Sequence, residues 1–326
     1  MSKPVITISP YGGGSPLPGL NALSSLKIGA SYHEQRDCRH PLGVYNISIG
    51  RICDKVAKCA DKLEAYWRIP GDLDSVESFG SVISDIVDYL DLTIYAAAEH
   101  VDDLEVITKT LYKTDREAAK SLDIKRFKKA IKPLRDETSM IANTIKHTHG
   151  RLRIYQTELG HAGNITRLVG FFIEGWENGG IAPHPLLHSG GKTVISVTSF
   201  LWNVLTYVGE MSVALAEFLT RINASDPDVV DVCDTPNFRK AAMKLARLPL
   251  YSFDDDHPFR RVRWVIKPDD EMRVEADSGI YGSLLTRWSK SSDGQIGRSI
   301  VLYAGDGATK MIRIAHPTKA SINRWD

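Results

Sequence analysis

The chain has 326 residues, of which 43% are hydrophobic and 25% are charged, and its formal net charge at pH 7 is +1. This composition is typical of a globular protein, and the chain is long enough to form two domains. The near-zero net charge excludes a protein whose overall field attracts nucleic acid or an anionic membrane, so any such attraction requires a local concentration of charge.

The sequence carries no signal for secretion, a membrane span or disulfide bonding. Its N-terminal residues lack the apolar segment of a signal peptide, and no apolar run reaches the ~18 residues that suggest a membrane span. The four cysteines show neither a CxxC pair nor the spacing of a disulfide framework. We therefore expect a cytoplasmic protein with reduced thiols and no membrane contact.

Residues 1–40 are rich in Gly, Pro and Ser, with three consecutive glycines at 12–14. This composition predicts an N-terminal arm that is either mobile or packed on a partner. Two long helices are predicted next, because apolar residues recur at helical spacing from Val44 to the Pro-Gly pair at 70–71 and again over Asp72–Leu111.

The second of these helices and the segment after it carry opposite charges. Residues 72–108 contain ten acidic residues and no Lys or Arg, whereas residues 109–153 contain thirteen basic and five acidic residues. We expect Ile124–His149 to form a helix, kinked or divided at Pro133, that packs antiparallel to Asp72–Leu111. The simpler interpretation is that the two charged faces neutralise each other, and the alternative is a basic surface that faces RNA.

After Gly150 the pattern changes to alternation of β-branched and aromatic residues. Two strands are predicted, at Arg151–Thr157 and Thr166–Trp176, before a further bundle helix at Val194–Ile222. The polar, acidic segment Ala224–Pro236 marks a domain boundary.

The last hundred residues predict a small unit that folds semi-independently. It contains one amphipathic helix, Pro236–Leu248, and two β-hairpins: Arg261–Ile266 with Met272–Ala276, and Ser299–Tyr303 with Met311–Ala315. The expected fold is mainly α within the α+β class. It comprises an N-terminal arm (1–40), a helical bundle with inserted strands (41–225) and a C-terminal α+β unit with hairpins (226–326).

Two apparent ligand motifs are incomplete. Residues 191–193 (GKT) match the end of a phosphate-binding P-loop, but Leu186 stands where that motif requires glycine. His147 and His149 are two residues apart on one helix and cannot converge on a metal, and no HExxH pattern accompanies them. We therefore predict no cofactor and no metal.

One polar cluster has a chemically suggestive spacing. Asn143 and His147 are four residues apart and share a helix face, with Lys146 beside them. This helix resembles the signature helix of the HEPN superfamily, whose α-helical bundles are common in prokaryotic toxins, nucleotidyltransferase partners and phage-defence proteins. The family motif is an Arg, a polar residue that is often Asn, three further residues and a His. Ala142 occupies the Arg position.

In active families of this kind, the resemblance implies metal-independent RNA cleavage at a dimer interface. The His acts as acid and base, and the Arg stabilises the charge that develops on phosphate. Ala142 can do neither, so Arg151 or Arg153 would have to replace the missing Arg. The alternative is a structural role in which Asn143, Lys146 and His147 satisfy backbone groups or cap the end of the bundle.

Three functions follow. The first is a HEPN-like protein of a prokaryotic antiviral-defence or toxin–antitoxin system, which binds RNA or a protein partner and lacks the usual RNase pair. The second is an active metal-independent RNase, with His147, Asn143, Lys146 and Arg151 as candidate catalytic residues. The third is a structural subunit that assembles through its N-terminal arm and bundle. We expect a homo-oligomer, either a dimer or a larger assembly.

Overall fold

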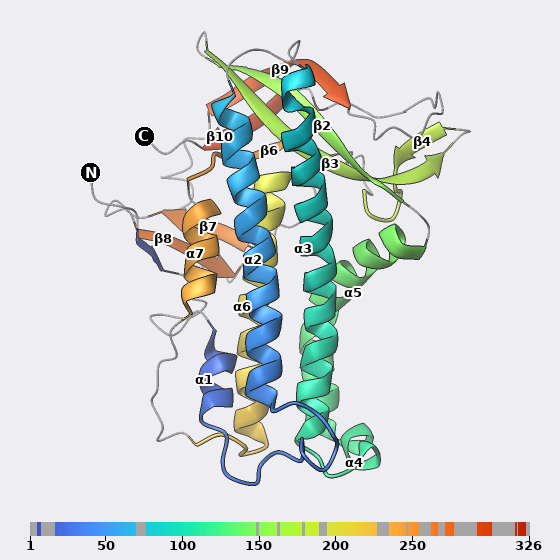
Figure 1. Cartoon of the computed structure of the whole chain (residues 1–326), viewed down its shortest axis with the longest axis vertical. Coiled ribbons are helices and arrows are strands. Elements are labelled where there is room, and N and C mark those ends of the chain that lie inside the picture. Colours follow the sequence, from blue (N-terminus) through green and yellow to red (C-terminus); the bar gives the residue numbers. More distant parts are fainter. Residues whose placement is uncertain are drawn as a thin grey trace.

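Four long helices run along the molecule, and an antiparallel sheet lies across one end of them (Figure 1). This computed structural model describes residues 5–7, 17–69, 76–147, 150–161, 164–177, 180–188, 194–226, 235–245, 247–253, 262–266, 271–276, 292–301, 317 and 319–323. The mainly helical α+β class expected from the sequence is confirmed.

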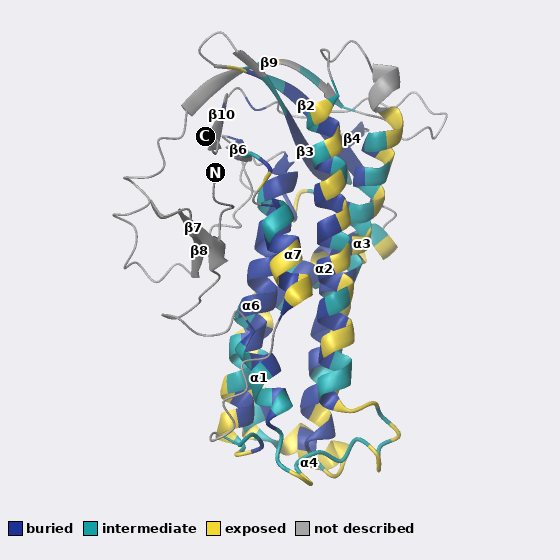
Figure 2. Cartoon of the chain, turned by 60° about the vertical axis from the view of Figure 1, so that its left-hand side comes forward, coloured by how far each residue is buried: buried dark blue, intermediate teal, exposed yellow. Residues whose placement is uncertain are grey.

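The first two long helices, α2 (Pro41–Arg68) and α3 (Val76–Thr110), form an antiparallel pair. Pro41 begins α2 at a position where a missing N–H costs nothing, and His40 Nδ1 accepts a hydrogen bond from the Leu42 N–H at 3.3 Å. The apolar stripes predicted for both helices are buried from Ile49 to Leu63 and from Ile83 to Ile107. Figure 2 shows these buried residues on the inner faces and the exposed residues on the outer faces.

Two helices follow α3 after a short turn. The short α4 (Asp115–Lys120) leads into α5 (Leu122–His147), which runs antiparallel to α3 and contacts it (Figure 1). Pro133 lies inside α5 without dividing it, and the second half of the helix turns away from α3 (Figure 1). Proline removes one helix hydrogen bond and its ring displaces a carbonyl, which accounts for the change of direction.

The helix α6 (Val197–Arg221) lies at the centre of the bundle. Its first half is buried almost all round. Along its length α6 contacts α1 (Pro18–Ser24), α2, α5, α7 (Pro236–Leu245) and strands of the sheet. No helix among the described residues is long and apolar enough to cross a membrane.

The prediction of an N-terminal arm over residues 1–40 is wrong for the residues that form α1. Leu17, Leu20 and Leu23 are buried in the core, so the chain is packed into the bundle from residue 17 onward. The Gly- and Pro-rich composition obscured this helix, although Pro18 stands at its first turn and the three leucines have helical spacing.

The main sheet has the strand order β4-β3-β2-β9-β10-β6, and the two-residue β5 (Ile195–Ser196) also pairs with β3. The two strands predicted after Gly150 are confirmed as an antiparallel pair, β2 and β3. The strands of the path are β4 (Gly180–Pro183), β3 (Asn164–Glu177), β2 (Leu152–His161), β9 (Ser292–Val301), β10 (Lys319–Asn323) and β6 (Leu250–Phe253). A second apolar cluster, which includes Tyr155, Phe172 and Tyr251, packs on this sheet.

The C-terminal region contributes to both sheets. The first predicted hairpin is confirmed, since β7 (Val262–Ile266) pairs antiparallel with β8 (Glu271–Ala276); β1 (Val5–Thr7) adds a parallel strand to β8. The second was expected to pair Ser299–Tyr303 with residues 311–315. Residues 302–316 lie outside the described part, and the end of β9 pairs with β2. The predicted boundary at residue 226 thus separates strands that share one sheet.

Candidate functional site

The polar cluster at the end of α5 faces outward. Asn143, Lys146 and His147 are exposed, whereas Ala142 is buried and faces the core. Within the described part of the chain, the side chains of the three polar residues form no hydrogen bond or ion pair, so none of them caps the bundle there. An Arg in place of Ala142 would start from a buried position.

Gly150 and Arg151, just before β2, are bonded to α5 and β3. The Gly150 N–H donates to the Thr144 carbonyl at 3.4 Å, and a Cβ on Gly150 would lie 2.9 Å from the Glu174 carbonyl oxygen. The Arg151 N–H donates to Glu174 Oε2 at 3.3 Å, and the Glu174 N–H donates to the Arg151 carbonyl at 2.9 Å. These reciprocal bonds fix the backbone of Arg151 on β3.

The two arginines proposed to replace the missing motif Arg have different environments. The Arg153 side chain is only 1% exposed, and its Nε forms an ion pair with the Glu174 carboxylate. Arg153 is therefore a buried residue that joins β2 to Glu174 of β3. Arg151 is exposed and lies four residues after His147 in the chain.

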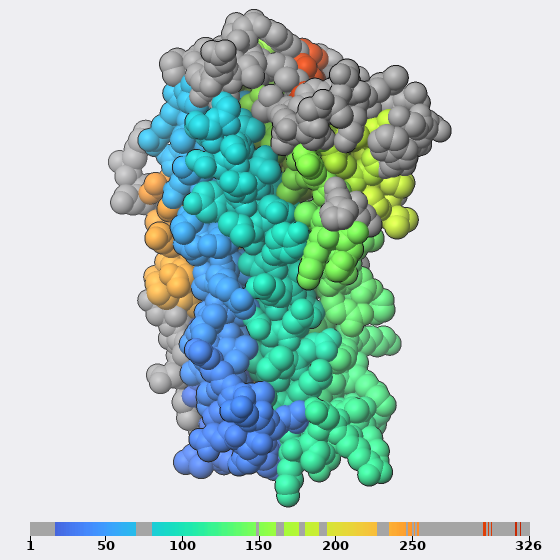
Figure 3. Space-filling view, turned by 45° about the vertical axis from the view of Figure 1, so that its right-hand side comes forward, coloured from blue at the N-terminus to red at the C-terminus, as the bar shows by residue number. Residues whose placement is uncertain are grey.

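A row of exposed lysines precedes this cluster on the same helix. Lys125, Lys129 and Lys132 are separated by four and three residues, which places them on one face of α5, opposite its buried stripe. We call Lys125, Lys129, Lys132, Lys146 and Arg151 the basic face of α5. From Lys125 to Lys146 it extends about 31 Å at 1.5 Å per residue. Figure 3 shows α5 in green beside α3 on one side of the molecule.

The acidic residues of α3 pair mainly with α2. Arg51 binds both Glu99 and Asp103 at 2.7 Å, and Lys62 binds Asp85 at 2.6 Å. Among the described residues, one ion pair joins α3 to α5, between Glu105 and Lys128 at 2.8 Å. The expected mutual neutralisation of these two helices is therefore limited to that pair.

Most of the basic face is left without an acidic partner. Lys132 forms an ion pair with Asp136 within α5. Lys125, Lys129 and Lys146 form none within the ranges that the structure describes. Sequence reasoning detected the excess of charge in this segment but did not single out Lys125, Lys129 and Lys132, although their spacing was visible.

Two histidines, His184 and His188, contact Ile173 of β3. His188 is buried and its Nε2 accepts a hydrogen bond from the Ile173 N–H at 3.1 Å, while burial lowers the pKa of His184 below its usual value. Across the described residues, no three His, Cys, Asp or Glu side chains are grouped to hold a metal ion. His149 and residues 191–193 lie outside the described part.

Comparison with known proteins gives no relative: no protein-family model, no curated protein and no solved structure matches the chain. The function must therefore be argued from the basic face itself.

Proposed function

We propose that this chain binds RNA through the basic face of α5. The observation that carries the proposal is the row of exposed lysines without acidic partners among the described residues, Lys125, Lys129 and Lys146. Lysine side chains in solvent bind phosphate groups, and each contact releases a condensed counterion from the nucleic acid. The resemblance of this helix to the HEPN signature helix supports a role in a prokaryotic defence or toxin-type system.

We propose further that the chain binds RNA without cutting it. A metal-independent RNase needs a cation beside its acid/base group to stabilise charge on phosphate. Ala142 cannot supply that charge, and the Arg153 guanidinium is paired with Glu174 inside the protein. His147 therefore lacks the Arg that accompanies the His in the family motif.

A second candidate function is an active RNase in which Arg151 replaces the missing Arg. Exposure of both Arg151 and His147 at the same end of α5 favours it. This alternative requires a homo-oligomer, because in active HEPN families the His and the Arg come from two subunits. RNA turnover by the wild type in EDTA, lost in His147→Ala at an unchanged melting temperature, would establish it. The same preparation run in analytical ultracentrifugation reports the oligomeric state.

The binding proposal is tested by fluorescence anisotropy with a labelled RNA at several salt concentrations. The variant K125Q/K129Q/K146Q removes three positive charges from the basic face. The control K55Q/K58Q/K62Q removes three from α2, where the lysines pair with Asp54 and Asp85. We expect the α5 variant to lose at least about 10-fold in affinity at 100 mM salt and to lower the salt slope by about 2.

The control variant should bind RNA like the wild type. Equal losses in both variants would show that RNA responds to total charge, and the basic face would then have no special role. No measurable binding by the wild type at 50 mM salt would overturn the proposal.

A further inference from the structure

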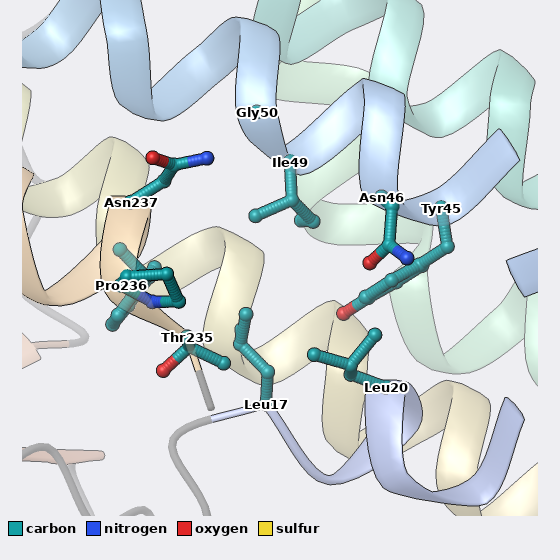
Figure 4. Close-up of a pocket in the computed structure, with 10 residues that line it drawn as sticks. Leu17, Leu20, Tyr45, Asn46, Ile49, Gly50, Thr235, Pro236 and Asn237 are labelled. Carbon is teal, nitrogen blue, oxygen red and sulfur yellow. The ribbon is translucent and has the colours of Figure 1, made fainter. Parts of the chain in front are cut away.

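A separate pocket lies beside α1 and α7, which are on the opposite side of α2 from α5 (Figure 1), and Figure 4 shows the residues that line it. It has a volume of about 140 Å³ and is formed by α1, the first half of α2 and the start of α7. Its apolar surface comes from Leu17, Leu20, Ile49 and Phe238, all of which are at least 93% buried. The pocket is thus a cavity at the edge of the hydrophobic core.

One wall of the pocket is held rigidly by a buried hydrogen-bond network. The Tyr45 hydroxyl donates to Ser212 Oγ at 2.8 Å, and the Gly19 N–H donates to the same oxygen at 2.9 Å. Because the Tyr45 hydroxyl is engaged by α6, this residue presents only its ring to the pocket. Burial also raises the pKa of Tyr45, so the phenol stays neutral.

Three polar side chains line the pocket, of which Asn46 and Asn237 are exposed and Thr235 is buried. Asn46, Thr235 and Asn237 line it from two elements, and their side chains form no hydrogen bond with any other described residue. Figure 4 shows Asn46 on α2 and Asn237 on α7, across the pocket from each other. None of the described residues that line the pocket is charged, so they do not favour a charged ligand.

We propose that this pocket binds one neutral six-membered ring with amide-type edges, of the kind found in pyrimidine bases and their nucleosides. The volume fits a single ring, since a protein cavity of about 150 Å³ holds one benzene molecule. A carboxamide offers two donors and one acceptor, and such groups pair with the matching donors and acceptors on the edge of a base. The apolar surface and the Tyr45 ring cover the faces of the ligand.

Gly50 keeps the pocket open. A Cβ added to Gly50 would have one neighbour within 4 Å, the Asn237 Nδ2 atom at 3.9 Å. A larger side chain at this position therefore occupies the pocket without displacing the protein. Gly50 lies inside α2, where replacing glycine favours the helix, so the variant is expected to fold.

The test is saturation-transfer NMR, followed by titration, with uracil and uridine as probes and benzene as the apolar control. Binding of uracil with binding of uridine indicates that the ribose stays outside the pocket; binding of uracil alone identifies the free base as the ligand. We expect Asn46→Ala and Asn237→Ala each to weaken binding about 2- to 12-fold, the effect of one neutral hydrogen bond. Gly50→Val should weaken it at least 10-fold.

The matched control is Gly80→Val, on α3, where an added Cβ has no neighbour within 4 Å. It should bind the probes like the wild type. K125Q/K129Q/K146Q should also leave probe binding unchanged, which separates this site from the RNA proposal. Absence of probe binding, equal binding of benzene and uracil, or unchanged binding in Gly50→Val would each overturn the proposal.

Discussion

Acid should destabilise this protein through one residue of its helical core, His100. The side chain lies on α3, is fully buried, and shares a hydrogen bond of 2.9 Å between its Nδ1 and Ser48 Oγ on α2. Its Nε2 has no partner among the described residues. Burial, assisted by the nearby Arg51 charge, lowers the pKa of His100 from 6.5 to about 3.

The size of the effect follows from this difference in pKa. The unfolded chain binds a proton at His100 below pH 6.5, whereas the folded chain does so only near pH 3. The stabilisation is therefore complete above pH 6.5 and is lost progressively as the pH falls toward 3. At pH 5 the loss is about 2 kcal/mol, at 1.36 kcal/mol for each pH unit below 6.5.

The assay is urea unfolding of the wild type and of His100→Gln at pH 7 and pH 5. Glutamine cannot titrate. The free energy of unfolding of the variant should therefore change by about 2 kcal/mol less between the two pH values than that of the wild type. Identical pH dependence in the wild type and His100→Gln, or an NMR titration of His100 near pH 6.5, would refute the reasoning.

Two further predictions concern Gly150 and Arg153, which lie close to the end of α5 in the chain. Gly150→Ala places a Cβ 2.9 Å from the Glu174 carbonyl oxygen, so urea unfolding should show a free energy of unfolding that is lower by about 1–3 kcal/mol. Gly80→Ala, where an added Cβ has no neighbour within 4 Å, should not destabilise the protein. Arg153→Met leaves the Glu174 carboxylate without its buried partner and should cost about 3–5 kcal/mol by the same measurement, more than the single-residue effect of Arg151→Met. Equal costs for the two arginine variants would contradict a buried role for Arg153.

The elements that the sequence predicted well are those whose signal is local. The stripes of α2, α3, α5 and α6 repeat over many turns, because each helix buries one side along its whole length. Alternation identified β2 and β3, and two short alternating runs close together in the chain predicted the pairing of β7 with β8. In each case the residues that decide the structure are close together in the chain.

The features that the sequence did not predict depend on distant segments. β9 pairs with β2 across more than a hundred residues, and no local pattern specifies that partner. The acidic residues of α3 bind α2, which contacts α3 more extensively than α5 does. The candidate site was found only in part for the same reason: exposure of Lys125 and burial of Arg153 depend on which elements cover each of them.

The near-zero net charge of the chain does not prevent binding of a polyanion at the basic face of α5. At physiological ionic strength charges more than about 8 Å apart are largely screened, so a ligand responds to the groups beside it. The α3 carboxylates Glu99, Asp103 and Asp85 are engaged by α2, which reduces their effect on such a ligand further. Four phosphate contacts, from Lys125, Lys129, Lys146 and Arg151, correspond to a salt slope of about −3. That slope is a roughly 50-fold loss of affinity between 50 and 200 mM salt. A markedly steeper slope would require contacts beyond α5, and a flat one would mean that binding does not depend on phosphate.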